Sequence, residues 1–479
     1  MTLPLHIFSE RVLLPDFSIH PCIIQIQNGV IQSVNPASRD IWSTWKKDLS
    51  ELEYEDLGDA LVTPAFVNAH THLCMLAFRG IGGLASLQGN VVKDLYFKLE
   101  RNLLPEDVRA FTRLGAVEAL LSGTGMVWEH YYFGDMLVEG LQDVGLCGAV
   151  ASTLQDIDGP GKDRTEKAWE ETFSLHQNSV AAAQGIVAVI GPHATDTVSD
   201  DLWTKIARAA DEHNLPIHSH LAQALDEVEW SWNNHEMSPL GRMQRLGLTD
   251  LEVNKLWVHA LYVGDDELKM LNPRFDRLGH CPAAQMQFGF PAHTNAWRNQ
   301  GFDVLLGTDS PSCNDSINVQ AELRLFGAAD AYGVTMGETL RKFRQDPILK
   351  KARAVKNERQ IIYDMRAPFV STENLLSTLW NHPADLHPQA PVGMIEDGRW
   401  ANLLVWDTNH PCFWPNTDPL QALAMANVTP GLKRIMTRGD WKFDGDGYLA
   451  HRVAMDPMVN LWRVEASERL GHLWNRAGL

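Results

Sequence analysis

The feature that most constrains this chain is a repeated alternation of short apolar runs with amphipathic helical patterns across residues 61–388. Apolar runs typical of buried strands end at residue 72 and recur at 126–128, 146–152, 186–190, 216–220, 256–259, 275–280 and 303–309. Helical patterns lie between them, among others at 105–123, 167–183 and 199–213. Alternation repeated about eight times predicts an α/β fold, a distorted (β/α)8 TIM barrel. A doubly wound sheet is the alternative, but it would not readily bring so many strand ends to one mouth.

Both ends of the chain have a different rhythm from the middle. Residues 1–60 contain short β-rich runs, and Asn28-Gly29 between two of them predicts a hairpin with a type I′ turn. Strands are expected again at 393–398, 401–407 and 432–437, after a charged helical insertion at 337–366 and a helix at 372–384. We therefore expect 1–60 and 389–455 to form a small composite β-sandwich beside the barrel, followed by a C-terminal helix at 456–479.

Composition excludes several classes of partner. The chain has 479 residues and a net charge of −19, which argues against a nucleic-acid partner because that needs a concentrated basic surface. A basic cluster at Lys350, Lys351, Arg353, Lys356 and Arg359 is interpreted as the solvated face of a helix. No apolar run is long enough to cross a membrane, and no signal peptide is evident at the N-terminus. Six scattered cysteines suggest free thiols in a reducing compartment, so we expect a cytoplasmic protein.

Histidines gather at the predicted C-terminal ends of the strands, where barrels of this type place their active sites. Eight of the 19 histidines end a predicted strand or lie just beyond one. The polar residues at these positions are His70, His72, Glu129, His130, His193, His218, His220, His259, His280 and Asp309.

These strand ends predict a metal centre. His70 and His72 are one residue apart after an apolar run, so both can project from one strand end. With one histidine of His218-Ser219-His220 and with Asp309 they supply the nitrogen and oxygen ligands of one divalent metal. Zinc is the first expectation, with iron or manganese as alternatives. Asp309 could also take a proton from water, and His259 could orient or polarise that water. The alternatives are a packed histidine at 259 and a plain turn aspartate at 309.

At these positions the sequence resembles the amidohydrolase superfamily, in the branch of the S-adenosylhomocysteine and guanine deaminases and the triazine hydrolases. The resemblance covers nearly the whole chain and rests on residues 64–72, 191–194, 218–222, 257–260, 280–282, 307–310 with Asn314-Asp315, and 393–407. It implies that His220 is the metal-binding histidine of its pair and that His193 contacts substrate. It also implies hydrolytic removal of a substituent, usually ammonia, from a heterocycle.

Departures from the family pattern concern the substrate side. The family usually has glutamate where this chain has Gln223, and glutamine cannot carry a proton. His193, His259 or a carboxylate among Asp226, Glu227 and Glu229 could carry it instead. Relatives often have aspartate in the region of Trp128-Glu129-His130, so Glu129, His130 and Trp128 are expected as local substrate contacts, with a barrel-core tryptophan as the alternative for Trp128. Arginine is common at the position of Cys147, which puts anionic-substrate recognition there in doubt.

We therefore expect a metal-dependent aminohydrolase acting on a purine, pterin, pyrimidine or triazine. In this interpretation Asp309, His259 and Gln223 are catalytic, and His193 with Gln223 holds the ring edge. A chloride, methylthio or alkylamine leaving group is the first alternative, and a non-catalytic metal- or ligand-binding homologue is the second. The expected partner is a small heterocyclic molecule, and a homodimer is expected from the resemblance only.

Overall fold

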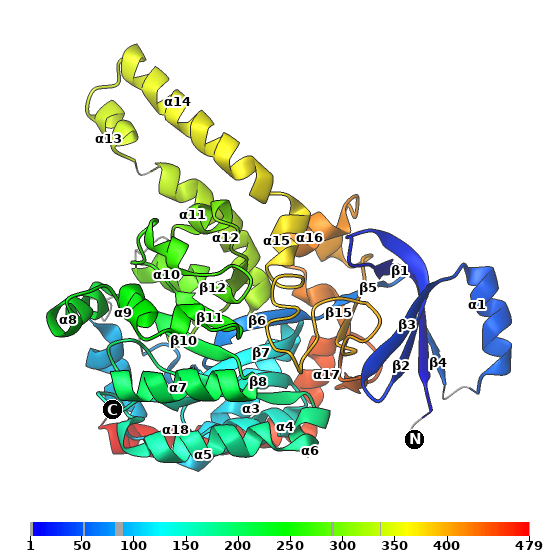
Figure 1. The fold of residues 1–479 in the computed structure, drawn as a ribbon. Coiled ribbons are helices and arrows are strands. Elements are labelled where there is room, and N and C mark those ends of the chain that lie inside the picture. The colour runs from blue at the N-terminus through cyan, green and yellow to red at the C-terminus, as the bar shows by residue number, and fades with distance from the viewer. Residues whose placement is uncertain (1–2, 51–52, 82–89, 289–291, 336, 479) are drawn as a thin grey trace.

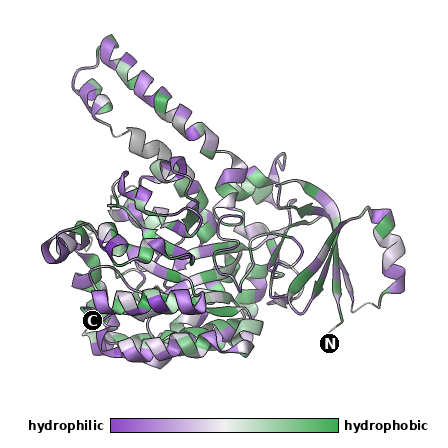
Figure 2. Ribbon diagram, viewed as in Figure 1, coloured by the Kyte–Doolittle hydropathy of each residue, from purple (hydrophilic) through white to green (hydrophobic). Residues whose placement is uncertain are grey.

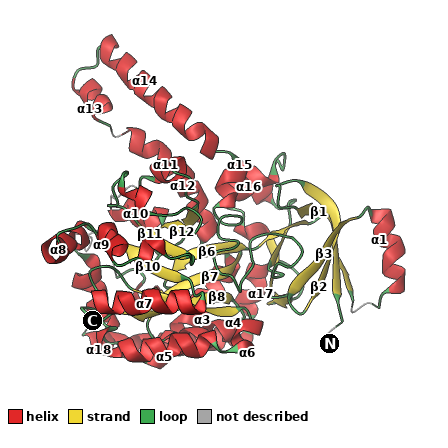
Figure 3. Ribbon diagram, viewed as in Figure 1, coloured by secondary structure: helices red, strands yellow, loops and turns green. Residues whose placement is uncertain are grey.

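The computed structural model describes residues 3–50, 53–81, 90–288, 292–335 and 337–478. Its strands fall into two groups, one inside a layer of helices and one beside it (Figure 1; Figure 3). Both groups are eight-stranded sheets. The predicted combination of a distorted barrel with a smaller β domain is confirmed.

The first sheet is the barrel, with parallel strands in the order β13-β12-β11-β10-β9-β8-β7-β6. These strands are β6 (Phe66–Thr71), β7 (Thr124–Tyr131), β8 (Cys147–Leu154), β9 (Ile186–Pro192), β10 (Ile217–Leu221), β11 (Lys255–His259), β12 (Asp276–His280) and β13 (Val304–Leu306). The barrel closes just beyond β13, where Asp309 forms a bridge with Thr71 and its amide donates to the His70 carbonyl at 3.0 Å. The closure therefore brings a predicted metal ligand of the last strand against the first strand.

Helices cover the outside of the barrel. They include α3 (Pro105–Leu121), α4 (Gly134–Val144), α5 (Thr165–His176), α6 (Ser179–Ala183), α7 (Asp200–His213), α8 (Leu225–His235), α9 (Pro239–Arg245), α10 (Pro282–Phe288), α11 (Thr294–Asn299), α12 (Val319–Thr335) and α15 (Thr372–Ser377). One buried apolar cluster packs these helices against the strands, and a second fills the barrel interior with residues such as Met126, Val189 and Val258. Figure 2 shows the same division, with hydrophobic strands at the centre and hydrophilic faces on the outer helices.

The second sheet joins the two ends of the chain, in the order β16-β15-β14-β5-β1-β2-β3 with β4 on β1. Its strands are β1 (Leu5–Leu13), β2 (Ile19–Gln27), β3 (Val30–Pro36), β4 (Tyr54–Asp56), β5 (Leu61–Pro64), β14 (Leu403–Trp406), β15 (Leu432–Thr437) and β16 (Asp440–Lys442). The antiparallel pair of β5 with β14 joins the N-terminal strands to the C-terminal ones. The chain thus leaves this sheet after Pro64 rather than after residue 60.

The turn between β2 and β3 has the predicted geometry. Asn28 and Gly29 both have positive φ, 52° and 75°, as a type I′ turn requires. Gly29 is also needed for packing, because a Cβ there would lie 2.6 Å from the Arg438 carbonyl oxygen.

Some predicted elements are shorter or broken. No strand occurs at 393–398, where Gly393 and Gly398 have positive φ and interrupt the extended backbone. The predicted helix at 167–183 is divided at Asn178, whose side chain caps α6. The helical insertion is two helices, α13 (Glu338–Gln345) and α14 (Leu349–Arg366), separated around Pro347, and together they project away from the barrel (Figure 1).

The remaining α-helices lie near the chain ends, apart from α2 and α16. They are α1 (Arg39–Trp45), α2 (Phe97–Glu100), α16 (Pro419–Met425), α17 (Leu449–Met455) and α18 (Pro457–Ala477). The last of these packs on α3, where Arg469 and Arg476 pair with the buried Asp107. Within the described part of the chain, no helix combines the length and apolarity needed to cross a membrane. All six cysteines are unpaired.

Candidate active site

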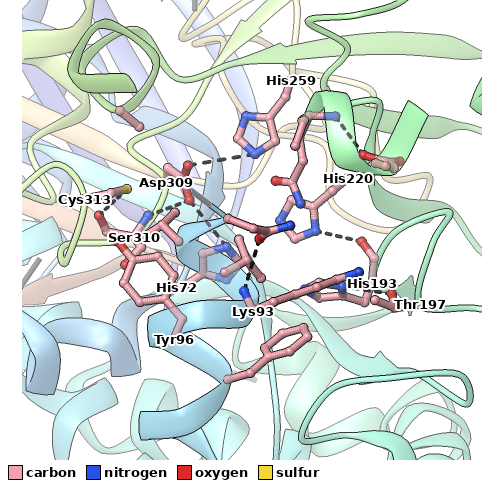
Figure 4. Close-up of a pocket in the computed structure, with 18 of the residues that line it drawn as sticks. His72, Lys93, Tyr96, His193, Thr197, His220, His259, Asp309, Ser310 and Cys313 are labelled. Atoms are coloured by element: carbon pink, nitrogen blue, oxygen red, sulfur yellow. Dashed lines mark hydrogen bonds and ion pairs between the residues drawn. The ribbon is translucent and has the colours of Figure 1, made fainter. Parts of the chain in front are cut away.

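A cavity of about 320 Å³ opens at the C-terminal ends of the barrel strands. Its walls include residues that follow β6, β7, β9, β10, β11 and β13, together with a segment at 90–100. Figure 4 shows His72, His193, His220, His259 and Asp309 converging on this space. Five of the eight strand-end histidines therefore line this cavity, namely His72, His130, His193, His220 and His259, whereas His70, His218 and His280 are not among its lining residues.

Five side chains offer a metal-binding centre. Donor atoms of His70, His72 and His220 lie within 4.8 Å of one another, and so do those of His70, His259 and Asp309. One Asp309 oxygen lies 3.5 Å from His72 Nε2 and 3.8 Å from His70 Nε2. The other lies 3.8 Å from His259 Nε2. The structure thus brings together the four predicted ligands and adds His259, which sequence reasoning assigned to water.

The Nδ1 atoms of these histidines, which point away from the metal donors, contact neighbouring groups of the chain. Nδ1 of His72 lies 2.5 Å from the carbonyl oxygen of His130, and Nδ1 of His220 lies 2.7 Å from that of His193. A carbonyl only accepts, so both Nδ1 atoms donate and each Nε2 keeps its lone pair for the centre. His70 Nδ1 lies 2.9 Å from His218 Nε2, and His259 Nδ1 lies 3.3 Å from Gln285 Nε2.

The donor set fits a divalent metal. Burial lowers the pKa of His72 and His259, and lowers that of His70 and His220 well below the usual range, so the rings are neutral as metal ligands must be. His70 Nε2 is buried without a hydrogen-bond partner although it faces the other donors. Three or four imidazoles with one carboxylate are ligands that zinc, iron and manganese accept.

Backbone strain collects at the same strand ends. Ala222 after β10, His259 and Ala260 at the end of β11, and Asp309 after β13 all have positive φ, between 46° and 74°. Such conformations are costly for residues with a side chain and persist where the surroundings impose them. Here they turn the chain directly after each strand, so that the donor groups face the cavity.

Three of the predicted substrate contacts line the cavity, namely His193, Gln223 and His130. His193 Nδ1 lies 3.0 Å from Thr197 Oγ1, and burial lowers the pKa of His193 to about 3. His130 lies against the rings of His193, His218 and His220, and its Nε2 has no partner. Gln223 follows β10, and its backbone N–H donates to the Glu227 carboxylate.

The other predicted contacts lie elsewhere. Trp128 belongs to the cluster inside the barrel and is not among the residues that line the cavity. Glu129 points away from the interior and accepts from the Leu73 amide at 2.9 Å; burial raises its pKa to about 8. Cys147 begins β8, at the strand end opposite the cavity, so the doubt about anion recognition at Cys147 does not bear on this site. The substrate-contact prediction for Trp128 and Glu129 has no support from this geometry.

Sequence reasoning missed one wall of the cavity. It is built by a π-helical turn (Val92–Tyr96) and α2, which contribute Lys93, Tyr96, Phe97 and Glu100. Asp196, just beyond β9, faces Lys93 at 2.8 Å. Only the acidic and basic side chains themselves could have suggested this wall, because residues 90–100 carry no strand or metal-ligand pattern.

Comparison with known proteins shows the family of the chain. The model of the amidohydrolase family matches residues 61–442. The chain belongs to the amidohydrolase family. The resemblance expected from the strand-end motifs is thereby confirmed.

This amidohydrolase is similar to a 5-methylthioadenosine/S-adenosylhomocysteine deaminase of Aquifex aeolicus, with 25% identity over 419 residues, 87% of each chain. Its fold is similar to that of a zinc-bound adenosine deaminase from Xanthomonas campestris, with a TM-score of 0.74, 22% identity and coverage of 97% of this chain and 99% of that one. It is also similar to the fold of an atrazine chlorohydrolase from Arthrobacter aurescens TC1 complexed with zinc (TM-score 0.73, 18% identity, 94% and 98% covered).

Proposed function

We propose that this amidohydrolase is a metal-dependent aminohydrolase that removes the amino group from an aminated nitrogen heterocycle. The observation that carries the proposal is the convergence of His72, His220, His259 and Asp309 on one cavity, with His70 within reach of the same donors. The other walls of the cavity include polar and aromatic side chains, among them His193 and Tyr96. The names of its relatives add that adenosine-type purines should be tested first. A homodimer and the identity of the metal stay predictions, with zinc first.

The metal would be held by His70, His72, His220 and Asp309, with His259 beside them. A divalent metal in such a set supplies a water nucleophile at neutral pH. The Asp309 carboxylate accepts the proton of the attacking water, and His259, 3.8 Å away, orients that water and stabilises the carboxyl. The water oxygen bonds to the ring carbon, the carbon–nitrogen bond breaks, and ammonia leaves with the transferred proton.

On the substrate side, neutral His193 presents Nε2 because its Nδ1 is engaged by Thr197. Gln223 can donate or accept at the ring edge but cannot carry a proton. Of the three carboxylates that could carry the proton in place of Gln223, Glu227 is the best candidate. It is buried and lines the cavity, and burial together with Asp196 raises its pKa to about 7. It accepts from the Ala222 and Gln223 amides at 2.9 and 2.8 Å, directly behind Gln223.

Gln223 also supports a second candidate function, hydrolysis of a better leaving group such as chloride, methylthio or an alkylamine. Loss of general acid assistance costs about 10²- to 10⁴-fold, which an activated leaving group tolerates best. Gln223→Glu separates the two: a gain in deamination supports a rerouted proton, whereas a collapse shows that the amide itself reads the substrate.

The proposal is tested with purified, zinc-loaded protein and a panel of purines, pterins, pyrimidines and triazines that carry amino, chloro or methylthio groups. Mass spectrometry of the products should show a gain of about one mass unit, from NH₂ to OH, for at least one amine. Loss of chloride or thiol with all amines untouched would favour the second candidate. No product from any compound would contradict both and support a binding protein.

A further inference from the structure

The charges on the cavity wall are strongly unequal. Among the described residues that line it, Lys93 is the one side chain with a fixed positive charge. Five carboxylates line the same space: Glu100, Asp196, Asp226, Glu227 and Asp309. The ranges of sequence outside the described structure, 82–89 and 289–291 among them, contain no lysine or arginine. They therefore cannot supply a further cation.

Lys93 is already paired. Its Nζ lies 2.8 Å from Asp196, which is 8% exposed at its side chain, while the side chain of Lys93 is 33% exposed. Figure 4 shows Lys93 and His259 on opposite sides of the cavity. A substituent that extends from a bound ring toward solvent would therefore meet an ion pair and not a free ammonium group.

The other carboxylates away from the metal donors are satisfied by neutral groups. Glu100 accepts from the hydroxyls of Tyr131 at 2.9 Å and Tyr132 at 3.5 Å. Asp226 accepts from the Asn90 side chain at 3.0 Å. Glu227 accepts from backbone amides and from Thr195. None of these three carboxylates accepts a hydrogen bond from a cation among the described residues, so each one that is ionised opposes a further negative charge in the cavity.

We propose that the substrate of this site is an aminated heterocycle without an anionic substituent, and that Asp196 enforces this choice by neutralising Lys93. This inference rests on the proposed function and narrows its substrate class. An anionic group would lose its hydration and would face the carboxylates of Asp196 and Asp226. Among the described lining residues the one fixed positive charge is that of Lys93, and Asp196 already engages it. A bound metal would lie among buried donors such as His70, whereas Lys93 is partly exposed. The positive charge of the metal would draw an anionic substituent toward the metal donors and so pull the ring out of the productive position.

The test uses pairs of compounds that differ by one carboxylate. One pair is 5′-methylthioadenosine and its S-carboxymethyl analogue, and the other is pterin and pterin-6-carboxylate. With zinc-loaded native protein we expect kcat/KM to favour the neutral member of the accepted pair by at least about tenfold, as expected for an unmatched charge in a partly buried site. Calorimetric binding should give the same preference without turnover.

Asp196→Asn should free Lys93 and reduce the ratio of kcat/KM for the neutral to the anionic compound by at least about fivefold, chiefly because kcat/KM for the anionic compound rises. Lys93→Gln should keep or widen this ratio, because the described residues that line the cavity then carry no fixed positive charge. Asp266→Asn is the matched control, since it breaks the exposed pair with Lys269 (2.6 Å), neither member of which lines the cavity, and should leave the ratio unchanged.

The outcomes are distinguishable. Similar kcat/KM for both members, or an Asp196→Asn ratio equal to that of the native protein, would contradict the substrate class while leaving the aminohydrolase function in place. If no neutral member is bound or converted, while the panel above also gives no deamination, the proposed function fails and the substrate class with it. Equal losses for both members in Asp196→Asn and Lys93→Gln would show a merely structural ion pair and would also overturn the inference.

Discussion

His220 Nδ1 lies 2.7 Å from the main-chain oxygen of His193, so the backbone of a proposed substrate contact stands directly behind a proposed metal ligand. The acceptor belongs to the main chain, and replacement of the His193 side chain leaves it in place. His193→Ala should therefore keep its metal content while kcat/KM falls about 10²- to 10⁴-fold. His220→Ala should lose metal. Elemental analysis beside steady-state kinetics measures both, and metal loss in His193→Ala would contradict the separation of roles.

His218 should act through His70. Its Nε2 lies 2.9 Å from His70 Nδ1, and removal of such a partner of a metal ligand typically lowers metal affinity about 10- to 100-fold. His218→Asn should show this loss in a competition titration with a chelator. His387→Asn is a matched control, because His387 is also buried against Trp128 but bonds the Ala188 carbonyl instead. Equal affinities for the native protein and His218→Asn would refute the positioning role.

Gly307 permits the close approach that closes the barrel at the metal site. A Cβ at this position would lie 2.6 Å from the His70 carbonyl oxygen and 2.8 Å from its Cβ. Gly307→Ala should therefore destabilise the protein by about 1–3 kcal/mol and reduce bound metal, because His70 and Asp309 must move apart. Gly471 lies on helix α18, and a Cβ there would meet no heavy atom from another part of the described chain within 4 Å. Gly471→Ala should therefore not lower the stability of the protein. Thermal melting and metal content of the two variants decide the point; a fully metallated, native-like Gly307→Ala protein would count against it.

Glu100 should make stability depend on pH. Burial raises its pKa to about 7, above the ordinary value of 4.5, although two tyrosine hydroxyls partly offset the effect. Between about pH 4.5 and 7 the native state keeps a proton that the unfolded chain has lost. The free energy of unfolding therefore falls as pH rises through this window, by up to about 1.4 kcal/mol per pH unit, and is level above it.

The variant Glu100→Gln removes this group and should flatten that part of the profile. Denaturant unfolding of both proteins at several values between pH 5 and 8 measures the difference. Parallel profiles would show that Glu100 does not hold its proton in the native state.

The site's metal side could be predicted from sequence because it depends on local pattern and on barrel topology. Parallel strands bring their C-terminal ends to one mouth, so histidines at the ends of apolar runs had to meet. The two-residue period of a strand explains why Trp128 and Glu129 do not line the cavity. Trp128 precedes His130 by two residues and lies deeper in the barrel interior, while Glu129 faces outward. Residue 147 begins its strand and could have been placed at the far end of the barrel.

The cavity wall could not be predicted in this way. Lys93 lies on the π-helical turn and contacts Asp196, while Glu100 ends α2 and contacts Tyr131. Only tertiary packing brings these residues together. His259 joins the metal donors because its backbone adopts a left-handed conformation, with φ of 74°, and no residue pattern in the sequence predicts that conformation. The strand predicted at 393–398 failed for a comparable reason, since its glycines adopt positive φ.

The central claim is that a bound metal is needed for hydrolysis of the heterocycle. The most direct test is to incubate the heterocycle panel in water enriched with ¹⁸O, once with zinc-reconstituted protein and once with protein verified to be metal-free. Metal-dependent hydrolysis predicts ammonia release and a product about three mass units heavier than the amine, from NH₂ to ¹⁸OH, only in the reconstituted sample. Asp309→Asn loaded with zinc should retain at most about a hundredth of that rate. Full activity in the metal-free protein, or a product without ¹⁸O, would contradict the central claim.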